Sequence, residues 1–128
     1  MKDNIKSNKN TKSMRDRRFV AVHRGGPLSK EHHRLLMRWA CNCARHVLPL
    51  LEDNVDERLT EALKTAKAWE KGEAWVGDAQ KAAWKAHAVA RETSSPVEIE
   101  VARAVGHAVA TAHMADHSLG PAYYGLKA

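Results

Sequence analysis

The sequence predicts an all-α fold: a single-domain antiparallel helical bundle of four main helices plus a short C-terminal helix or turn. The chain has 128 residues, enough for one hydrophobic core and too few for two. Alanine is frequent, whereas the β-branched and aromatic residues that favour strands are few. Apolar residues recur at helical spacing in four stretches joined by short connections, which favours antiparallel neighbours.

The positive charge is concentrated at the N-terminus. The net charge is +6, yet residues 1–24 hold eight basic and two acidic side chains, while the remaining residues hold thirteen of each. Residues 1–18 are polar and basic, which predicts a disordered tail, and residues 19–128 form the predicted helical domain. We expect residues 19–22 to lie extended against the core, before Gly25, Gly26 and Pro27 end the segment.

The first helix is predicted to begin after Ser29, a good N-cap, and to bend or end at Pro49. Its predicted apolar face consists of Leu35, Leu36, Trp39, Ala40, Cys43 and Val47. The opposite face holds a positive stripe of Lys30, Arg34, Arg38, Cys41 and Arg45. The side chains of Cys41 and Cys43, two residues apart on a helix, point in different directions. We therefore expect two reduced thiols and no disulfide between them.

The second helix is predicted to start at Asp56 and to stop at Gly72. It should bury Leu59, Ala62, Leu63, Ala66 and Trp69. The third is expected from Gly77 or Asp78 to Glu92, with an apolar face of Val76, Ala79, Ala83 and Ala90.

The fourth helix has the clearest start, because Ser95, Pro96 and Glu98 form a capping box with proline at the first helical position. We expect it to continue until just before Gly120. Its polar residues form one narrow stripe: Glu100, Arg103, His107, Thr111 and Ser118. A helix that is apolar almost all round is expected at the centre of the bundle.

Histidine is the enriched functional type, with eight in the chain. Continued helical geometry would point His87, His113 and Asp116 inward, with His117 one turn beyond His113. Buried polar groups need partners, so we predict a buried polar network of His87, His113 and Asp116, with Arg91 as a further partner. A partner-binding pocket and a metal site at His87, His113 and His117 are the alternatives.

The sequence contains no defensible catalytic motif. No nucleophile is tied by spacing to the histidines, and the zinc-protease pattern His-Glu-x-x-His is absent. We therefore expect a protein that is not an enzyme, has no catalytic residues and no resident metal, and requires no cofactor.

Several surfaces are candidates for binding a partner. Arg34, Arg38 and Arg45 could contact phosphate or an acidic protein patch. Trp39 and Trp69 are expected in the core, whereas Trp75 and Trp84 are candidate exposed anchors. The end of the fourth helix, at His113, Asp116 and His117, is a further candidate. The basic tail and first helix together suggest nucleic acid as an alternative partner.

The sequence contains no apolar run near the roughly 20 residues that span a bilayer. The basic start is not followed by the apolar region of a secretory signal. We therefore expect no membrane partner and a cytoplasmic location.

Several separated segments, in order, resemble a known family. Residues 19–26 read FVAVHRGG, residues 35–48 LLMRWACNCARHVL, residues 63–72 LKTAKAWEKG and residues 106–120 GHAVATAHMADHSLG, followed by Ala122-Tyr123 and Lys127-Ala128. Together they resemble the immunity-five-like family of immunity proteins from bacterial polymorphic toxin systems. The resemblance implies an all-helical protein, encoded beside a toxin, that binds the toxin and blocks it. It implies no catalytic site.

The leading hypothesis is therefore a cytoplasmic immunity-type protein that neutralises a cognate toxin by occlusion. The first alternative is a small nucleic-acid-associated protein that uses the basic tail and first helix. The second is a metal-binding helical domain. Affinity for nucleic acid should fall steeply with ionic strength if the first alternative holds.

Overall fold

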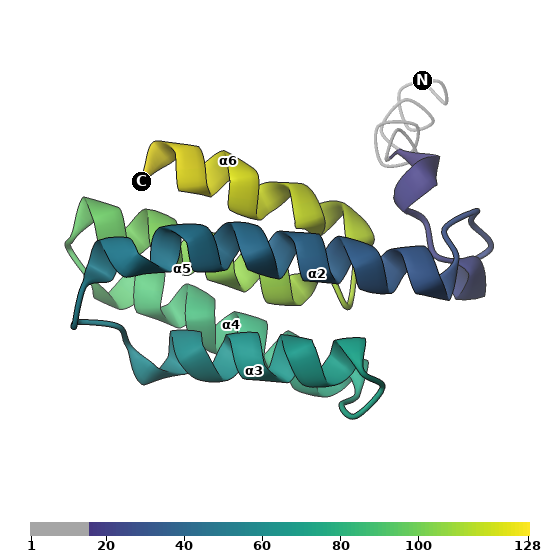
Figure 1. Ribbon diagram of the computed structural model, residues 1–128, viewed down its shortest axis with the longest axis horizontal. Coiled ribbons are helices and arrows are strands. Elements are labelled where there is room, and N and C mark those ends of the chain that lie inside the picture. Colours follow the sequence, from purple (N-terminus) through teal and green to yellow (C-terminus); the bar gives the residue numbers. More distant parts are fainter. Residues whose placement is uncertain (1–15) are drawn as a thin grey trace, which may run out of the picture.

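The computed structural model describes residues 16–128, and these residues form an all-α bundle (Figure 1). Its α-helices are α2 (Lys30–Val47), α3 (Glu57–Glu70), α4 (Val76–Glu92), α5 (Pro96–Ala110) and α6 (Gly120–Lys127). Four 3₁₀ turns lie beside them: η1 (Arg17–Phe19), η2 (Val22–Arg24), η3 (Leu48–Leu51) and η4 (Ala115–Leu119). The prediction of an all-α bundle with four main helices and a short C-terminal helix is confirmed.

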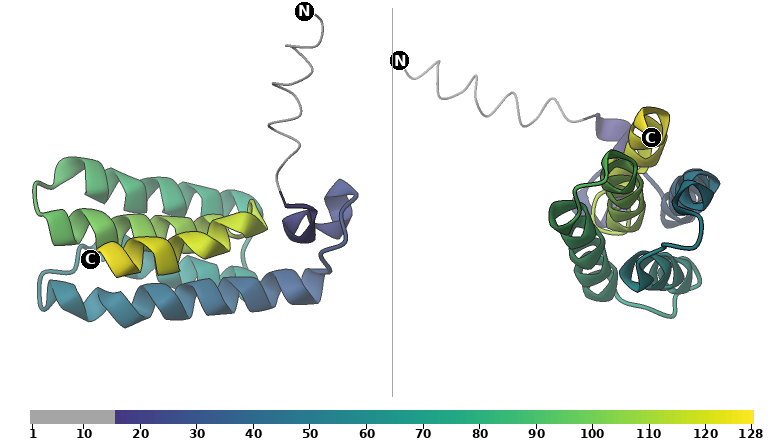
Figure 2. Two further views of the ribbon diagram at one scale, coloured as in Figure 1. Left: turned by 90° about the horizontal axis from the view of Figure 1, so that it is seen from above. Right: turned by 90° about the vertical axis from the view of Figure 1, so that its left-hand side faces the viewer.

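Consecutive helices run in opposite directions, and α5 lies at the centre of the bundle (Figures 1 and 2). It packs against α2, α3, α4 and α6. The predicted central position of α5 is confirmed by its burial. Seven of its fifteen residues are buried, and several of them lie on opposite faces of the helix. The C-terminal helix α6 covers α5 and α2.

Local signals set most helix starts as predicted. The Ser29 hydroxyl accepts a hydrogen bond from the His32 amide at 3.1 Å, and the Asp56 carboxylate accepts one from the Arg58 amide at 2.9 Å. The Ser95 hydroxyl accepts from the Glu98 amide at 3.2 Å. These bonds satisfy amides that have no partner within the helix. After α3, Gly72 adopts a positive φ of 78°, which suits glycine at a helix end.

The prediction for the buried face of α2 is wrong. The residues that α2 buries are His33, Met37, Ala40, Cys41 and Ala44. Leu35 and Trp39 are exposed, and Cys41 is buried instead of completing the positive stripe. The helix is turned by about one residue, roughly 100°, from the predicted orientation. Both faces carry apolar groups: one packs on α5, and Cys43 and Val47 on the other are half-buried beside α6.

The prediction that the fourth helix continues to Gly120 is also wrong, because α5 ends at Ala110. The His33 ring Nε2 donates a hydrogen bond of 2.6 Å to the Thr111 carbonyl. An uninterrupted helix would use this carbonyl for the amide four residues later. Met114 is extended, with φ −140° and ψ 115°, and η4 follows. The sequence has no glycine or proline between 111 and 114 to signal the break.

The described part of the predicted tail and extended segment is irregular. Residues 1–15 of the predicted tail lie outside the described residues, and Asp16 caps η1 through the Arg18 amide. The segment 19–22 is not extended throughout, because η2 begins at Val22. Ala21 and Leu28 are buried and form an isolated bridge across the turn that contains Gly25 and Gly26. Among residues 16–128, no helix is long and apolar enough to cross a bilayer.

Candidate functional site

A cluster of three imidazoles lies where four elements meet. His87 comes from α4, His107 from α5 and His117 from η4. The His87 and His107 rings meet edge to face with centroids 5.1 Å apart, and the His107 and His117 centroids are also 5.1 Å apart. The Tyr124 ring of α6 stacks on His107 at 5.1 Å. The cluster therefore ties α6 and η4 to the central helix.

Hydrogen bonds restrict the protonation of this histidine cluster. Arg103 Nη1 donates to His87 Nδ1 at 2.9 Å, so His87 accepts at that nitrogen. The Nδ1 atoms of His107 and His117 are 3.1 Å apart, which requires one of them to donate and the other to accept. Full protonation of all three rings would break both bonds, because an imidazolium has no acceptor nitrogen.

Two glycines of the segment 106–120 make room for these rings. A Cβ at Gly106 would lie 2.5 Å from His87 Cε1, and a Cβ at Gly120 would lie 2.5 Å from His107 Cβ. Neither glycine has a positive φ, so these positions are defined by close packing and not by an unusual backbone. The absence of a side chain at Gly106 and Gly120 therefore lets the rings of His87 and His107 pack closely against α5 and α6.

Burial and neighbouring cations disfavour positive charge on the histidine cluster. Burial lowers the pKa of His87 to about 4, and the charges of His107, Arg103, Arg91 and His117 act in the same direction. Burial also lowers the pKa of His107, with further contributions from His117 and Arg103. The folded bundle therefore favours neutral His87 and His107.

The folding stability should consequently fall in mild acid. Unfolded His87 takes up a proton near pH 6.5, whereas folded His87 does so near pH 4, so its contribution is complete above about 6.5 and is lost as the pH falls toward 4. We expect a loss of about 1–2 kcal/mol from this residue, after allowance for its partial exposure. Urea unfolding followed by circular dichroism at several pH values would measure it.

The His87→Gln variant provides the test, because a glutamine oxygen can still accept from Arg103 while the side chain does not titrate. Its loss of stability between pH 6.5 and 4 should be smaller than that of the unmodified chain. The exposed His32→Gln change is the matched control, because it removes an imidazole that lies outside the cluster. Parallel pH profiles for all three proteins would contradict the assignment.

The structure brings together only part of the predicted buried network. His87 and His117 both meet His107, which the pattern placed on a polar stripe. Arg91 is exposed, so its prediction as a member of a buried network is wrong. His113 and Asp116 are half-buried and lie beyond the end of α5. The directions of their side chains therefore cannot be obtained by extending the helical geometry of α5. This difference follows from the break after Ala110.

His33 is a buried polar residue that the pattern missed. Besides its bond to Thr111, its ring meets the Trp69 ring edge to face at 4.9 Å. Burial lowers the pKa of His33, which favours the neutral ring. His33 shares one helical face with the buried residues Met37, Ala40 and Ala44, so the prediction missed it because it assigned the wrong buried face to α2. Within residues 16–128, no group of three or more His, Cys, Asp or Glu side chains is placed to hold a metal ion.

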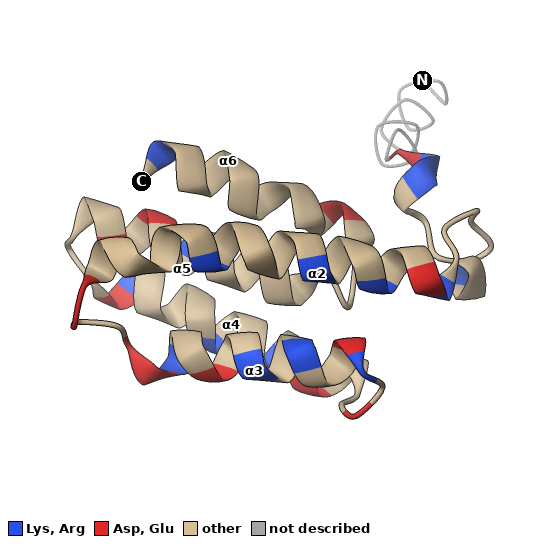
Figure 3. Ribbon diagram, viewed as in Figure 1, with Lys and Arg blue, Asp and Glu red and all other residues tan. Residues whose placement is uncertain are grey.

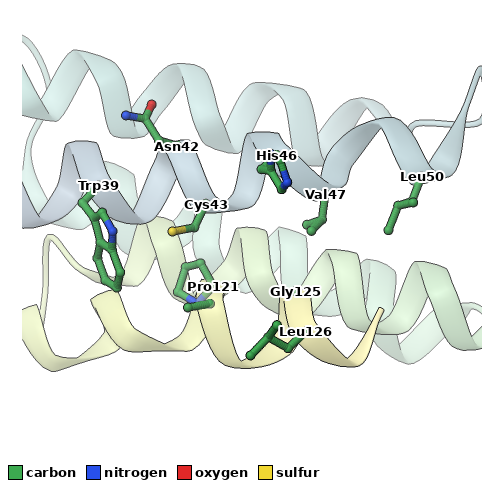
Figure 4. A pocket seen from close by; sticks show the side chains of 10 residues that line it. Trp39, Asn42, Cys43, His46, Val47, Leu50, Pro121, Gly125 and Leu126 are labelled. Carbon is green, nitrogen blue, oxygen red and sulfur yellow. The ribbon is translucent and has the colours of Figure 1, made fainter.

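A second feature is an apolar groove between α2 and α6 (Figure 4). It has a volume of about 750 Å³. Its lining residues are Trp39, Asn42, Cys43, His46, Val47, Leu50, Pro121, Ala122, Gly125 and Leu126. Trp39 extends from α2 toward α6, and Leu126 lies on the other wall (Figure 4). Burial raises the pKa of the Cys43 thiol, so the neutral thiol forms part of the apolar lining.

The predicted arginines form a stripe along α2 that does not line this groove. Arg38 and Arg45 are exposed, and Arg34 is half-buried near the turn at Gly72. Arg38 forms an ion pair with Glu70 of α3 at 2.6 Å. Figure 3 shows these cations along α2, where Glu31 is the sole acidic residue.

The two candidate tryptophan anchors do not line this groove. Trp75 is 82% exposed at the start of α4, and Trp84 is 60% exposed in the middle of the same helix. Lys81 and Lys85 are exposed on the same helix as Trp84. Most of the basic tail that would carry a nucleic-acid interface lies outside the described residues, so that alternative stays a prediction.

The fold and these features define an all-α bundle with an internally bonded histidine cluster and an open apolar groove. The family model described as "Imm-5 like putative immunity protein" matches residues 26–128. The chain belongs to this family of immunity proteins. The match includes all five described α-helices, the histidine cluster and the groove. Neither the curated proteins nor the solved structures contain a match to the chain.

Proposed function

We propose that this protein binds a cognate bacterial toxin and neutralises it by occlusion, as part of a polymorphic toxin system in the bacterial cytoplasm. Membership of the immunity family over residues 26–128 carries the proposal. The toxin is the protein partner, and neither catalysis nor a cofactor is required.

The surface supports binding as the mode of action. Trp39 at the groove and the exposed Trp75 and Trp84 supply aromatic side chains, and α2 supplies arginines; tryptophan and arginine dominate the energetics of protein interfaces. The histidine cluster, in contrast, is engaged with Arg103 and Tyr124 inside the bundle. These contacts support a structural role for the cluster, which packs α6 and η4 against α5.

The neutralisation test is co-expression with the toxin encoded beside the gene. The toxin alone should arrest growth, and co-expression should restore it. Purified together, the two proteins should form a stoichiometric complex that survives about 0.3 M salt, at which loose electrostatic contacts are screened. Continued growth arrest with both proteins present and soluble would contradict the proposal.

The arginine stripe allows a sharper experiment on the same complex. The triple variant R34E/R38E/R45E should weaken toxin affinity at least about tenfold, since truncating or reversing an interface charge costs on the order of 1.4 kcal/mol or more. The matched control K64E/K81E/K85E reverses three exposed charges on α3 and α4. Equal affinity for the two triple variants would remove the stripe as a toxin contact.

A further inference from the structure

A second pocket lies at the end of the bundle where α2 begins and where α3 turns into α4 (Figure 1). Its volume is about 720 Å³. Pockets of about 300–1,000 Å³ enclose a small ligand, so this one has room for a few residues of a peptide loop. Its walls come from η2, the first turn of α2, the end of α3 and the turn that leads into α4. We name it the end pocket.

The least exposed part of the end pocket is held in place by contacts inside the bundle. His33 lines it and is 5% exposed, and its ring is fixed by the bond to the Thr111 carbonyl and by the Trp69 ring. Trp69 also lines the pocket and packs against the hydrophobic core. A lining that is fixed before binding loses little conformational freedom when a ligand enters. Trp75, in contrast, is 82% exposed at the opening, where a bound partner would cover it.

Arg34 is a half-buried cation of this pocket that no described side chain neutralises. In the described part of the chain, two other Lys or Arg side chains are half-buried, Arg58 and Arg103. Arg58 pairs with two carboxylates at 3.0 and 2.8 Å, and Arg103 donates to His87. Arg34 reaches the turn after α3, where a Cβ at Gly72 would lie 3.8 Å from its Nη2, yet it forms no hydrogen bond or ion pair with a described residue. A partly desolvated charge without a counter-charge is costly, which favours a bound anion.

The other charges of the end pocket favour a carboxylate as that anion. Lys30 is the second cation of the lining and Glu73 its single acid, and neither forms an ion pair with another described residue. One carboxylate from a partner would balance this lining. A nucleic acid brings a charge with every phosphate, and Glu73 would repel the excess. A guanidinium binds a carboxylate through two parallel hydrogen bonds, which one oriented side chain can provide.

We propose that the end pocket binds an acidic loop of the toxin, an inference that rests on the proposed function. An Asp or Glu carboxylate of that loop pairs with the Arg34 guanidinium beside Lys30. A neighbouring apolar side chain of the loop lies against Trp69 and Trp75. Arginine and tryptophan are the residue types that most often carry the binding energy of an interface.

The N-terminal residues of the chain itself are a less suitable occupant. Residues 1–15 contain four lysines, one arginine and one aspartate. They therefore carry the same sign as Arg34 and Lys30, and like charges placed against each other are unfavourable. The charge of the lining favours an acidic partner over this segment.

The first test uses two short blocked peptides that are identical except for one glutamate or glutamine between two leucines. Nuclear magnetic resonance of the ¹⁵N-labelled full chain gives the affinity and the location of binding. We expect the glutamate peptide to bind about fivefold more tightly and to shift the indole signals of Trp69 and Trp75. Equal affinities, no binding, or shifts confined to Trp39 and Trp84 would overturn the proposal.

Two further titrations test the other occupants. Oligouridine that binds at the same indoles more tightly than the glutamate peptide would assign the end pocket to nucleic acid and overturn the proposal. A shift of the Trp75 indole on raising the protein concentration, without any peptide, would assign it to a second copy of the chain and overturn it equally. We expect neither change.

Variants of Arg34 test the anchor. Arg34→Gln should lower the affinity for the glutamate peptide about fivefold, to that of the glutamine peptide, and Arg34→Lys should recover part of it because lysine keeps the charge without the planar fork. Arg91→Gln removes an exposed arginine of α4 outside the pocket and should leave the affinity unchanged. Equal losses in the two glutamine variants would overturn the proposal. Trp75→Ala changes an exposed side chain and should also weaken binding.

The toxin itself separates this inference from the proposed function. Failure of the unmodified chain to bind or neutralise the toxin would contradict the function, whereas the peptides would still judge the end pocket. Neutralisation and toxin affinity that are unaffected by Arg34→Gln and Trp75→Ala would leave the function standing and overturn the end pocket as the toxin site. An Asp or Glu to Arg change in the toxin that restores affinity for Arg34→Glu would support both and identify the carboxylate.

Discussion

Replacement of Gly106 by valine should destabilise the bundle by about 3 kcal/mol or more, as expected for overpacking of a tight core. Gly106 is buried in the interior of α5, and its added Cβ would lie 2.5 Å from the His87 ring. The ring cannot move away freely, because Arg103 donates a hydrogen bond to its Nδ1 and the nearly perpendicular His107 ring packs against it. Urea unfolding followed by circular dichroism would measure the change.

A double-mutant cycle tests the cause of this effect. Combining Gly106→Ala with His87→Ala should cost less than the sum of the two single changes, because the new methyl group enters space vacated by the ring. The control is Gly77→Ala in the first turn of α4, where a Cβ meets nothing within 4 Å and the change should be neutral or slightly stabilising. Additive effects at positions 87 and 106 would contradict the packing argument.

Truncation of Met37 should cost about 2–5 kcal/mol, far more than truncation of its larger neighbour Trp39. Met37 is fully buried, and its sulfur accepts a 3.6 Å hydrogen bond from the Cys41 thiol. Met37→Ala therefore leaves a cavity in the core. Trp39 is 42% exposed at the groove, so Trp39→Ala should cost about 1 kcal/mol or less in the absence of a partner. Thermal and urea unfolding of both variants would compare them.

This pair distinguishes the observed orientation of α2 from the one that its periodicity predicts. If Trp39→Ala proved more damaging to folding than Met37→Ala, the helix would bury its other face. The same two variants separate stability from binding. Trp39→Ala should weaken an interaction at the groove while leaving the fold intact, and Met37→Ala should act through folding.

Only some features of the candidate sites can be predicted from the sequence. The exposure of Trp75 was predicted from its place in a turn, and that of Trp84 from its place at the edge of an apolar helix face. The arginine stripe was predicted from the three- and four-residue spacing of its members. His107 and His117 meet only because α5 ends at Ala110 and η4 turns back beside it. The groove likewise requires α6 to lie against α2, a contact between segments more than seventy residues apart.

The sequence alone determined the all-α class, most helix starts and the central place of α5, because these depend on local capping bonds and on composition within one segment. The tertiary structure decided which face α2 buries, where α5 ends and which histidines meet. In α2, apolar residues occur around much of the helix, so packing against α5 and α6 sets its rotation. In α5, the His33 ring binds the Thr111 carbonyl from a distant helix, a tertiary bond that the local sequence does not signal.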